Sequence, residues 1–232
     1  APKECMELST FYKILTEIRS VYTPLELNDI SFATYNEPNL DEGFKEKLML
    51  MTSMGFQYEH ISNGSMITTE LTDFLIQYPQ NIKQFRLNIP TLDESKWKDI
   101  TGSSVSVLYR MFYQLEYLFS RSSQLNFPIT VIVNGDGGED HKMEFQKVYQ
   151  KFAHYKGINL SMTGLIDRAG TLEGAECETQ KLPSGEIDWG DQPLRCNAGY
   201  FDNLYFGIKG NVFYCCHDYH QDYSCGNIND TP

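Results

Sequence analysis

The chain has 232 residues and a formal net charge of −12, from 19 Lys+Arg and 31 Asp+Glu. An acidic surface repels phosphate groups, which argues against binding to nucleic acid or to anionic membranes. Hydrophobic residues (41%) and aromatic residues (13%) suffice for a packed core. No apolar run approaches the roughly 20 residues of a membrane span, and residues 1–6 hold no secretory signal. We therefore expect a cytoplasmic protein.

Runs of β-forming residues alternate with apolar residues at helical spacing through residues 1–171. We expect, in chain order, a helix capped by Ser9, strand 29–35, helix 44–54, strand 58–62, helix 68–76, strand 84–89, helices 94–100 and 105–119, strand 129–133, a helix around 145–152 and strand 158–162. This alternation predicts an α/β fold with a parallel sheet and right-handed crossovers, either a barrel or a doubly wound sheet. Because the chain opens on a helix, we expect a preceding strand to be missing.

In such sheets the functional loops lie at the carboxyl ends of the strands. Glu37, between Asn36 and Pro38, follows the first predicted strand. A carboxylate there suits an ammonium group, a ribose or a metal, and a solvated turn residue is the alternative interpretation. Asn63 ends the next strand in a turn signal, and Arg168 follows the fifth strand, where a cation could hold a carboxylate.

Cysteine is concentrated near one end of the sequence. Four of the six cysteines fall in the last 37 residues: Cys196, Cys215, Cys216 and Cys225. A hairpin predicted from 204–208 and 211–214 could fold Cys215 back toward Cys196. Sulfur ligands suit zinc or an iron–sulfur cluster, and His217 and His220 could complete a zinc set. Buried free cysteines or a disulfide remain the alternatives.

Taken in order, these segments resemble the motifs of the radical S-adenosylmethionine (radical SAM) enzymes that carry a C-terminal SPASM-type auxiliary domain. Tyr35-Asn36-Glu37-Pro38 is similar to the family's Gly-Glu-Pro, Ser62-Asn63-Gly64 to its Thr-Asn-Gly, and Asn88-Ile89-Pro90 to its Ser-Leu-Asp. The resemblance implies that Glu37 binds the amino group of S-adenosylmethionine. The expected cofactor-binding residues are Asn36, Glu37, Pro38, Asn63, Asn88 and Arg168.

The C-terminal pattern has the same kind of likeness. Cys196, Gly210 and Cys215 match the SPASM order of Cys, nine to fifteen residues, Gly, four residues and Cys. The resemblance implies that auxiliary [4Fe-4S] ligands come from Cys196, Cys215, Cys216 and Cys225. It also implies a partial (βα)6 barrel at 1–171 without its first strand, an irregular linker at 172–195 and an incomplete SPASM-like domain at 196–232.

The sequence departs from the family at both ends. The Cys-x₃-Cys-x₂-Cys loop that holds the SAM-binding [4Fe-4S] cluster is not among the 232 residues, and the later SPASM cysteines are also missing. We interpret this as truncation, so the chain alone would be inactive; a degenerate, non-catalytic relative is the other interpretation.

The resemblance implies that the whole enzyme would cleave S-adenosylmethionine reductively. The resulting 5′-deoxyadenosyl radical would abstract hydrogen from a peptide or other bulky substrate, with electrons from a reductant such as flavodoxin or ferredoxin. The alternatives are a non-catalytic α/β binding protein with a structural zinc or disulfide site at its C-terminus, and a metal-free hydrolase or transferase using Glu37 and Asp41.

Overall fold

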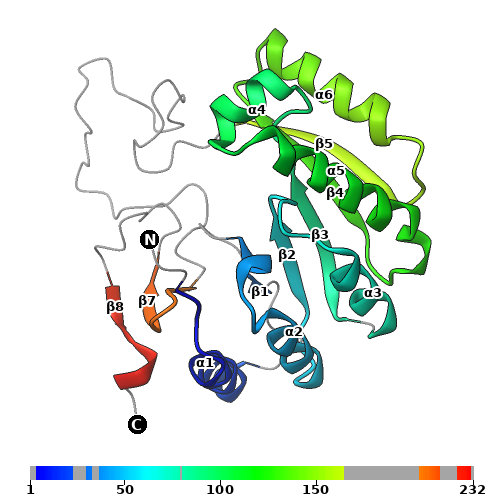
Figure 1. Cartoon of the computed structure of the whole chain (residues 1–232). Coiled ribbons are helices and arrows are strands. Elements are labelled where there is room, and N and C mark those ends of the chain that lie inside the picture. Colours follow the sequence, from blue (N-terminus) through cyan, green and yellow to red (C-terminus); the bar gives the residue numbers. More distant parts are fainter. Residues whose placement is uncertain are drawn as a thin grey trace, which may run out of the picture. The chain divides into compact units, whose positions relative to one another are not determined.

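The computed structural model describes residues 4–22, 30–32, 37–78, 80–164, 204–214 and 224–230. The chain divides into two compact units, one of residues 15–164 and one of residues 1–14 together with 165–232. Figure 1 shows the elements of both. No helix within the described ranges is both long and apolar enough to cross a membrane.

Strands and helices alternate from the N-terminal helix, which the division after residue 14 splits between the units, through the larger unit. From the N-terminal helix onward the elements are α1 (Leu8–Val21), β1 (Ile30–Ser31), η1 (Pro38–Leu40), α2 (Phe44–Ser53), β2 (Tyr58–Ser62), α3 (Thr69–Gln77), β3 (Ile82–Asn88), α4 (Glu94–Thr101), α5 (Val105–Ser120), η2 (Ser122–Gln124), β4 (Ile129–Gly135), α6 (Glu139–Phe152) and β5 (Ile158–Gly164). The predicted α/β alternation is confirmed.

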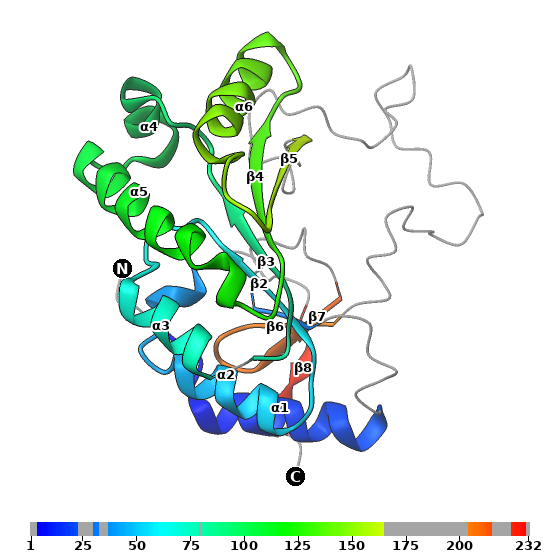
Figure 2. The ribbon, with the colours of Figure 1, turned by 90° about the vertical axis from the view of Figure 1, so that its right-hand side faces the viewer.

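The five strands form one parallel sheet in the order β1-β2-β3-β4-β5. Doubly wound sheets reverse their strand order at a switch point, and no reversal occurs among the described strands. The connecting helices lie on one face of the sheet (Figure 2), as right-handed crossovers between consecutive parallel strands require. All five carboxyl ends therefore meet at one edge.

The helix-facing side of the sheet is the core of this unit. Its strand residues are Tyr58, His60, Ser62, Phe85, Leu87, Ile129, Val131 and Val133, all of them buried. Phe44 of α2 stacks on His60 with ring centroids 5.0 Å apart, and Phe119 of α5 meets Phe152 of α6 edge-on at 5.1 Å. Aromatic packing of this kind fixes the helices against the strands.

The helix ends differ in part from the sequence predictions. Helix α3 begins as predicted, because the Thr68 hydroxyl accepts a hydrogen bond from the Leu71 N–H at 3.1 Å. Helix α1 already begins at Leu8, so Ser9 lies inside its first turn and does not cap it. Helix α6 starts at Glu139, well before its apolar spacing becomes clear, because acidic residues suit a first turn.

The smaller unit contains an antiparallel sheet of β6 (Tyr205–Phe206), β7 (Asn211–Phe213) and β8 (Ser224–Asn227), followed by η4 (Ile228–Asp230). The first two strands pair around the predicted turn, and β8 was not predicted. Gly210 in that turn has φ +85°, and a Cβ there would come within 2.8 Å of Ile228 Cγ2. Only glycine fits this backbone conformation and this close approach.

Candidate functional site

The loop after β1 places the Glu37 carboxylate against the end of β2. Glu37 Oε2 accepts a hydrogen bond from the Asn63 N–H at 2.7 Å. Its Oε1 accepts one from the Ser62 hydroxyl at 2.8 Å and one from the Asn39 N–H at 3.2 Å. The carboxylate therefore ties together the first two loops at the carboxyl edge of the sheet.

Local sequence explains how this carboxylate is positioned. Pro38 opens η1, where its missing N–H costs nothing, and Glu37 caps the same short helix. On the other loop, Gly64 has φ +76° and its N–H donates to the Ser62 hydroxyl at 2.9 Å. This tight turn leaves the Asn63 N–H free to point at Glu37.

The Glu37 carboxylate is partly buried and surrounded by hydrogen-bond donors. Burial raises the pKa of Glu37 above its usual value, although hydrogen bonds from Asn63, Ser62 and Asn39 oppose that shift. A carboxylate offers about four acceptor positions, and the Glu37 carboxylate accepts hydrogen bonds from Asn63, Ser62 and Asn39. The Asn39 Oδ1 atom is buried and has no partner in the described part of the chain. A carboxylate in this position suits an ammonium group.

The structure describes some of the other predicted site residues and not the rest. Asn63 contacts Glu37, and Pro38 is buried beside it. Asn88 is the last residue of β3, the strand next to β2, so it shares the carboxyl edge with Asn63. Five predicted residues lie outside the described ranges: Asn36, Arg168, Cys196, Cys215 and Cys216. Their roles stay predictions.

Two residues of the Glu37 network were not predicted as site residues. Ser62 donates to Glu37 and also accepts from the Asn39 side-chain amide at 2.9 Å. The sequence signals for Ser62 are its place in the Ser62-Asn63-Gly64 segment and a hydroxyl at the end of a strand whose other inward residues are large. Asn39 carries no signal beyond its place in a turn, because its partner is 23 residues away.

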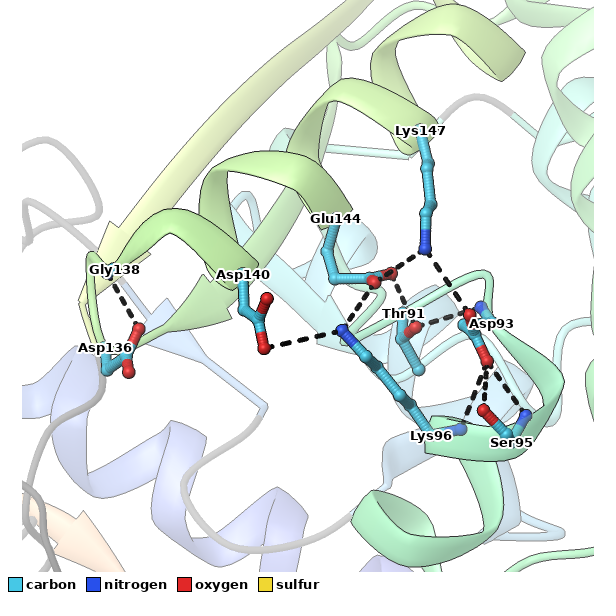
Figure 3. A network of polar contacts seen from close by, with 9 residues as sticks. All are labelled: Thr91, Asp93, Ser95, Lys96, Asp136, Gly138, Asp140, Glu144 and Lys147. Carbon is cyan, nitrogen blue, oxygen red and sulfur yellow. Dashed lines mark hydrogen bonds and ion pairs between the residues drawn. The ribbon is translucent and has the colours of Figure 1, made fainter.

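A second polar cluster joins the loop after β3 to helix α6 (Figure 3). Glu144, whose side chain is 7% exposed, accepts hydrogen bonds from the Thr91 hydroxyl at 2.7 Å, Lys96 Nζ at 3.0 Å and Lys147 Nζ at 2.9 Å. Burial opposes ionisation of Glu144, but these bonds together lower its pKa. Since Lys147 also pairs with Asp93 at 3.4 Å, the charges are mutually compensated. We interpret the cluster as a clamp between α4 and α6.

The described residues do not supply a ligand set for a metal cluster. No group of three or more His, Cys, Asp and Glu side chains gathers within the described ranges. Cys225 of β8 is exposed, with its Sγ 3.1 Å from the Val212 carbonyl oxygen, and Cys5 is also exposed. The fit of an iron–sulfur cluster to this chain therefore rests on cysteines outside these ranges.

Comparison with known proteins places the fold. No protein-family model matches the sequence, and no curated protein matches it. Among solved structures, SuiB of Streptococcus suis bound to the precursor peptide SuiA is similar with a TM-score of 0.64 at 10% identity, covering 96% of this chain and 56% of SuiB. SuiB bound to S-adenosylmethionine gives a TM-score of 0.56 at 10% identity, with the same coverage.

A different protein, BtrN in complex with AdoMet and 2-DOIA, is also similar. Its TM-score is 0.52 at 13% identity, covering 97% of this chain and 67% of BtrN. The chain thus spans little more than half the length of the SuiB chains that it matches. At these identities the comparisons show the fold alone, which this chain shares with SuiB and BtrN.

Proposed function

We propose that this chain is part of a radical SAM oxidoreductase, and that the sheet edge at Glu37 binds the amino group of S-adenosylmethionine. The observation that carries the proposal is the Glu37 carboxylate, fixed by Ser62 and Asn63 at the carboxyl edge of the sheet. The fold supports it, because similar structures include SuiB bound to S-adenosylmethionine and BtrN in complex with AdoMet.

The chemistry of the donor set fits the ligand. An ammonium group brings three N–H donors and no acceptor. An ionised Glu37 only accepts hydrogen bonds, and the buried Asn39 Oδ1 has no partner among the described residues. The Asn63 N–H holds the Glu37 carboxylate in place before a ligand binds. Ligand binding would therefore cost little conformational entropy of this side chain. Asn36, Pro38, Asn88 and Arg168 would complete the cofactor site.

The rest of the proposal follows the family resemblance. Residues 1–171 would form a partial (βα)6 barrel without its first strand, which the unbroken strand order supports. Residues 172–195 would be a linker, and residues 196–232 an incomplete SPASM-like domain. Cys196, Cys215, Cys216 and Cys225 would hold an auxiliary [4Fe-4S] cluster. The chemistry available when the family's [4Fe-4S] cluster is bound would be reductive cleavage of S-adenosylmethionine. The resulting 5′-deoxyadenosyl radical would abstract hydrogen from the substrate.

The substrate and partners are proposed on similar grounds. SuiB has been crystallised with a precursor peptide, which supports a peptide as substrate. The electron would come from a small reductant such as flavodoxin or ferredoxin. This chain's own contribution would be to bind and orient S-adenosylmethionine and to keep water away from the reacting atoms.

Calorimetric titration of the purified full-length protein with S-adenosylmethionine tests the site. Glu37→Gln should weaken binding at least about tenfold, because a charge-assisted hydrogen bond is lost. The matched control is Glu42→Gln, the same change at an exposed residue nearby, and it should leave the affinity unchanged. Unchanged affinity in Glu37→Gln would refute the assignment.

The pH dependence supplies a further check. Only the ionised form of Glu37 attracts an ammonium group, and burial raises its pKa. Affinity should therefore fall as the pH drops through that raised pKa, approaching tenfold per pH unit below it. Titration in two buffers of different ionisation enthalpy should show proton release in wild type. Neither effect should appear in Glu37→Gln.

The competing function, a binding protein with a structural zinc or disulfide site, is separated by metal analysis. Anaerobic reconstitution should load iron and sulfide and give charge-transfer absorption if the SPASM-like assignment holds. Stoichiometric zinc without iron would favour the binding protein.

A further inference from the structure

The sheet of the larger unit has a second face, opposite the connecting helices (Figure 2). The register places twelve strand residues on it: Ser31, Glu59, Ile61, Gln84, Arg86, Asn88, Thr130, Ile132, Asn134, Asn159, Ser161 and Thr163. All but Ile61 and Ile132 are polar. A barrel interior that serves only as packing is filled with Val, Ile and Leu. This polar face is therefore suited to water or a polar ligand.

A chain of contacts across three strands fixes Arg86 in the middle of that face. The Arg86 Nε–H donates to Gln84 Oε1 at 3.0 Å, and the Gln84 amide donates to the Thr130 hydroxyl at 2.7 Å. Arg86 Nη2 lies 3.4 Å from Glu59 Oε1 on β2. Each partner comes from a strand, so the guanidinium is held on a rigid scaffold.

The contacts occupy one side of the guanidinium and leave the other open. An arginine has five N–H donors in a planar fork. Gln84 takes Nε and Glu59 faces Nη2, and no contact to Nη1 occurs within the described part of the chain. The Arg86 side chain is 39% exposed, whereas Glu59 is 15% exposed. Glu59 is therefore mostly buried and holds Arg86 in position, whereas the remaining N–H donors of Arg86 are accessible.

We propose that Arg86 binds a carboxylate of the substrate on this face of the sheet. Arg86 is the sole lysine or arginine among the twelve strand positions, so it is the one positively charged side chain that these strands place on this face. Guanidinium and carboxylate form short charge-assisted bonds with defined geometry. The inference rests on the proposed function, because there this face is the reaction cavity.

The position of Arg86 favours the substrate over S-adenosylmethionine as the source of the carboxylate. Arg86 lies two residues inside the end of β3, which is roughly 7 Å along the strand. Glu37, the proposed amino-group site, lies beyond the strand ends and contacts Asn63. The amino and carboxylate groups of one methionyl moiety share a single carbon, so the cofactor carboxylate stays near Glu37.

The test uses a small probe, N-acetyl-L-glutamate N-methylamide, against its neutral isostere N-acetyl-L-glutamine N-methylamide. Both are titrated into the full-length protein while the Arg86 Nε–H signal is followed by NMR. The acidic probe should shift that signal saturably and bind at least about tenfold more tightly than the amide. Absence of a shift, or equal affinity for both probes, would overturn the inference.

Variants make the assignment specific. Arg86→Gln should abolish the preference for the acidic probe, and Arg86→Lys should reduce it by loss of the fork. Arg110→Gln, which removes the same charge from an exposed position on α5, should keep the wild-type preference. Thermal unfolding of each variant shows whether it is folded. The wild-type NMR titration tests the inference by itself, even if a variant fails to fold.

Titration of the same samples with S-adenosylmethionine separates this inference from the proposed function. Arg86→Gln should leave cofactor affinity within twofold of wild type. A parallel loss of cofactor and probe binding would assign Arg86 to the cofactor carboxylate and overturn the inference. Loss of cofactor binding in Glu37→Gln alone, with probe binding intact, is the expected complement. Failure of wild type to bind the cofactor, with the probe response intact, would refute the proposed function alone.

Discussion

His60 in the middle of β2 should make the protein sensitive to mild acid. Its ring is completely enclosed, packed on Phe44 at 5.0 Å and on Phe85 at 4.4 Å between centroids. Neither ring nitrogen has a hydrogen-bond partner among the described residues. Burial without a partner disfavours the charged imidazolium and lowers the pKa of His60 to about 3.

The size of the effect follows from linkage. A histidine takes up a proton near pH 6.5 when the chain is unfolded, but His60 takes one up only near pH 3 in the fold. Acidification below about pH 6.5 therefore favours the unfolded state, and the loss grows until the pH reaches the folded pKa. Between pH 7 and pH 5, His60 alone should cost about 2 kcal/mol of the free energy of unfolding.

Urea unfolding of wild type and His60→Phe at pH 7 and pH 5 measures this cost. The variant removes the titrating group, so its loss of stability between the two pH values should be about 2 kcal/mol smaller than that of wild type. A misfit of the larger ring would shift both measurements equally and leave the difference intact. The control is His154→Phe, since His154 is exposed. An identical pH dependence in wild type and His60→Phe would show that His60 is not buried as a neutral ring.

Two further changes probe the edge of the sheet near α6. Gly135→Ala would place a Cβ 2.4 Å from the His141 ring, and urea unfolding should show a loss of about 1–3 kcal/mol from overpacking; no loss would mean that the ring moves freely. Glu144→Gln should cost about 1–2 kcal/mol at pH 7, because Lys96 and Lys147 lose a charged acceptor. Since the pKa of Glu144 is lowered, that cost should be present above pH 4.5 and fade as the pH falls through the folded pKa. A cost that stays constant down to pH 2 would contradict the charge-based explanation.

Much of the larger unit is predictable because its information is local. Strand β2 has the predicted bounds, since Tyr58 follows a helix-ending Gly55 and Asn63-Gly64 forms a turn. The parallel arrangement follows from alternation alone. Choosing between a barrel and a doubly wound sheet requires the order of strands, which depends on packing between distant segments. The strand β8 was missed for a similar reason, because Ser224–Asn227 has weak β propensity and pairs through its neighbour β7.

The candidate site was predictable in its chemistry and less so in its partners. A carboxylate after a strand end marks Glu37 from sequence. The hydroxyl that holds it comes from Ser62, 25 residues away, and nothing local shows that the two meet. Arg86 carries no sequence signal of its own, because β3 alternates polar and apolar residues and only the register shows that Arg86 shares a face with Glu59 and Gln84.

Neighbouring residues of the same strand serve opposite requirements in this sheet. Phe85 is fully buried and packs on His60, whereas the next residue, Arg86, keeps its guanidinium on the open face. Because side chains alternate between faces, the packing around His60 and the proposed carboxylate contact of Arg86 involve separate sets of residues on one scaffold. The helix-facing set can be densely packed without restricting what the open face binds. That separation is what allows Glu37 and Arg86 to be tested for ligand binding independently of the stability effect expected at His60.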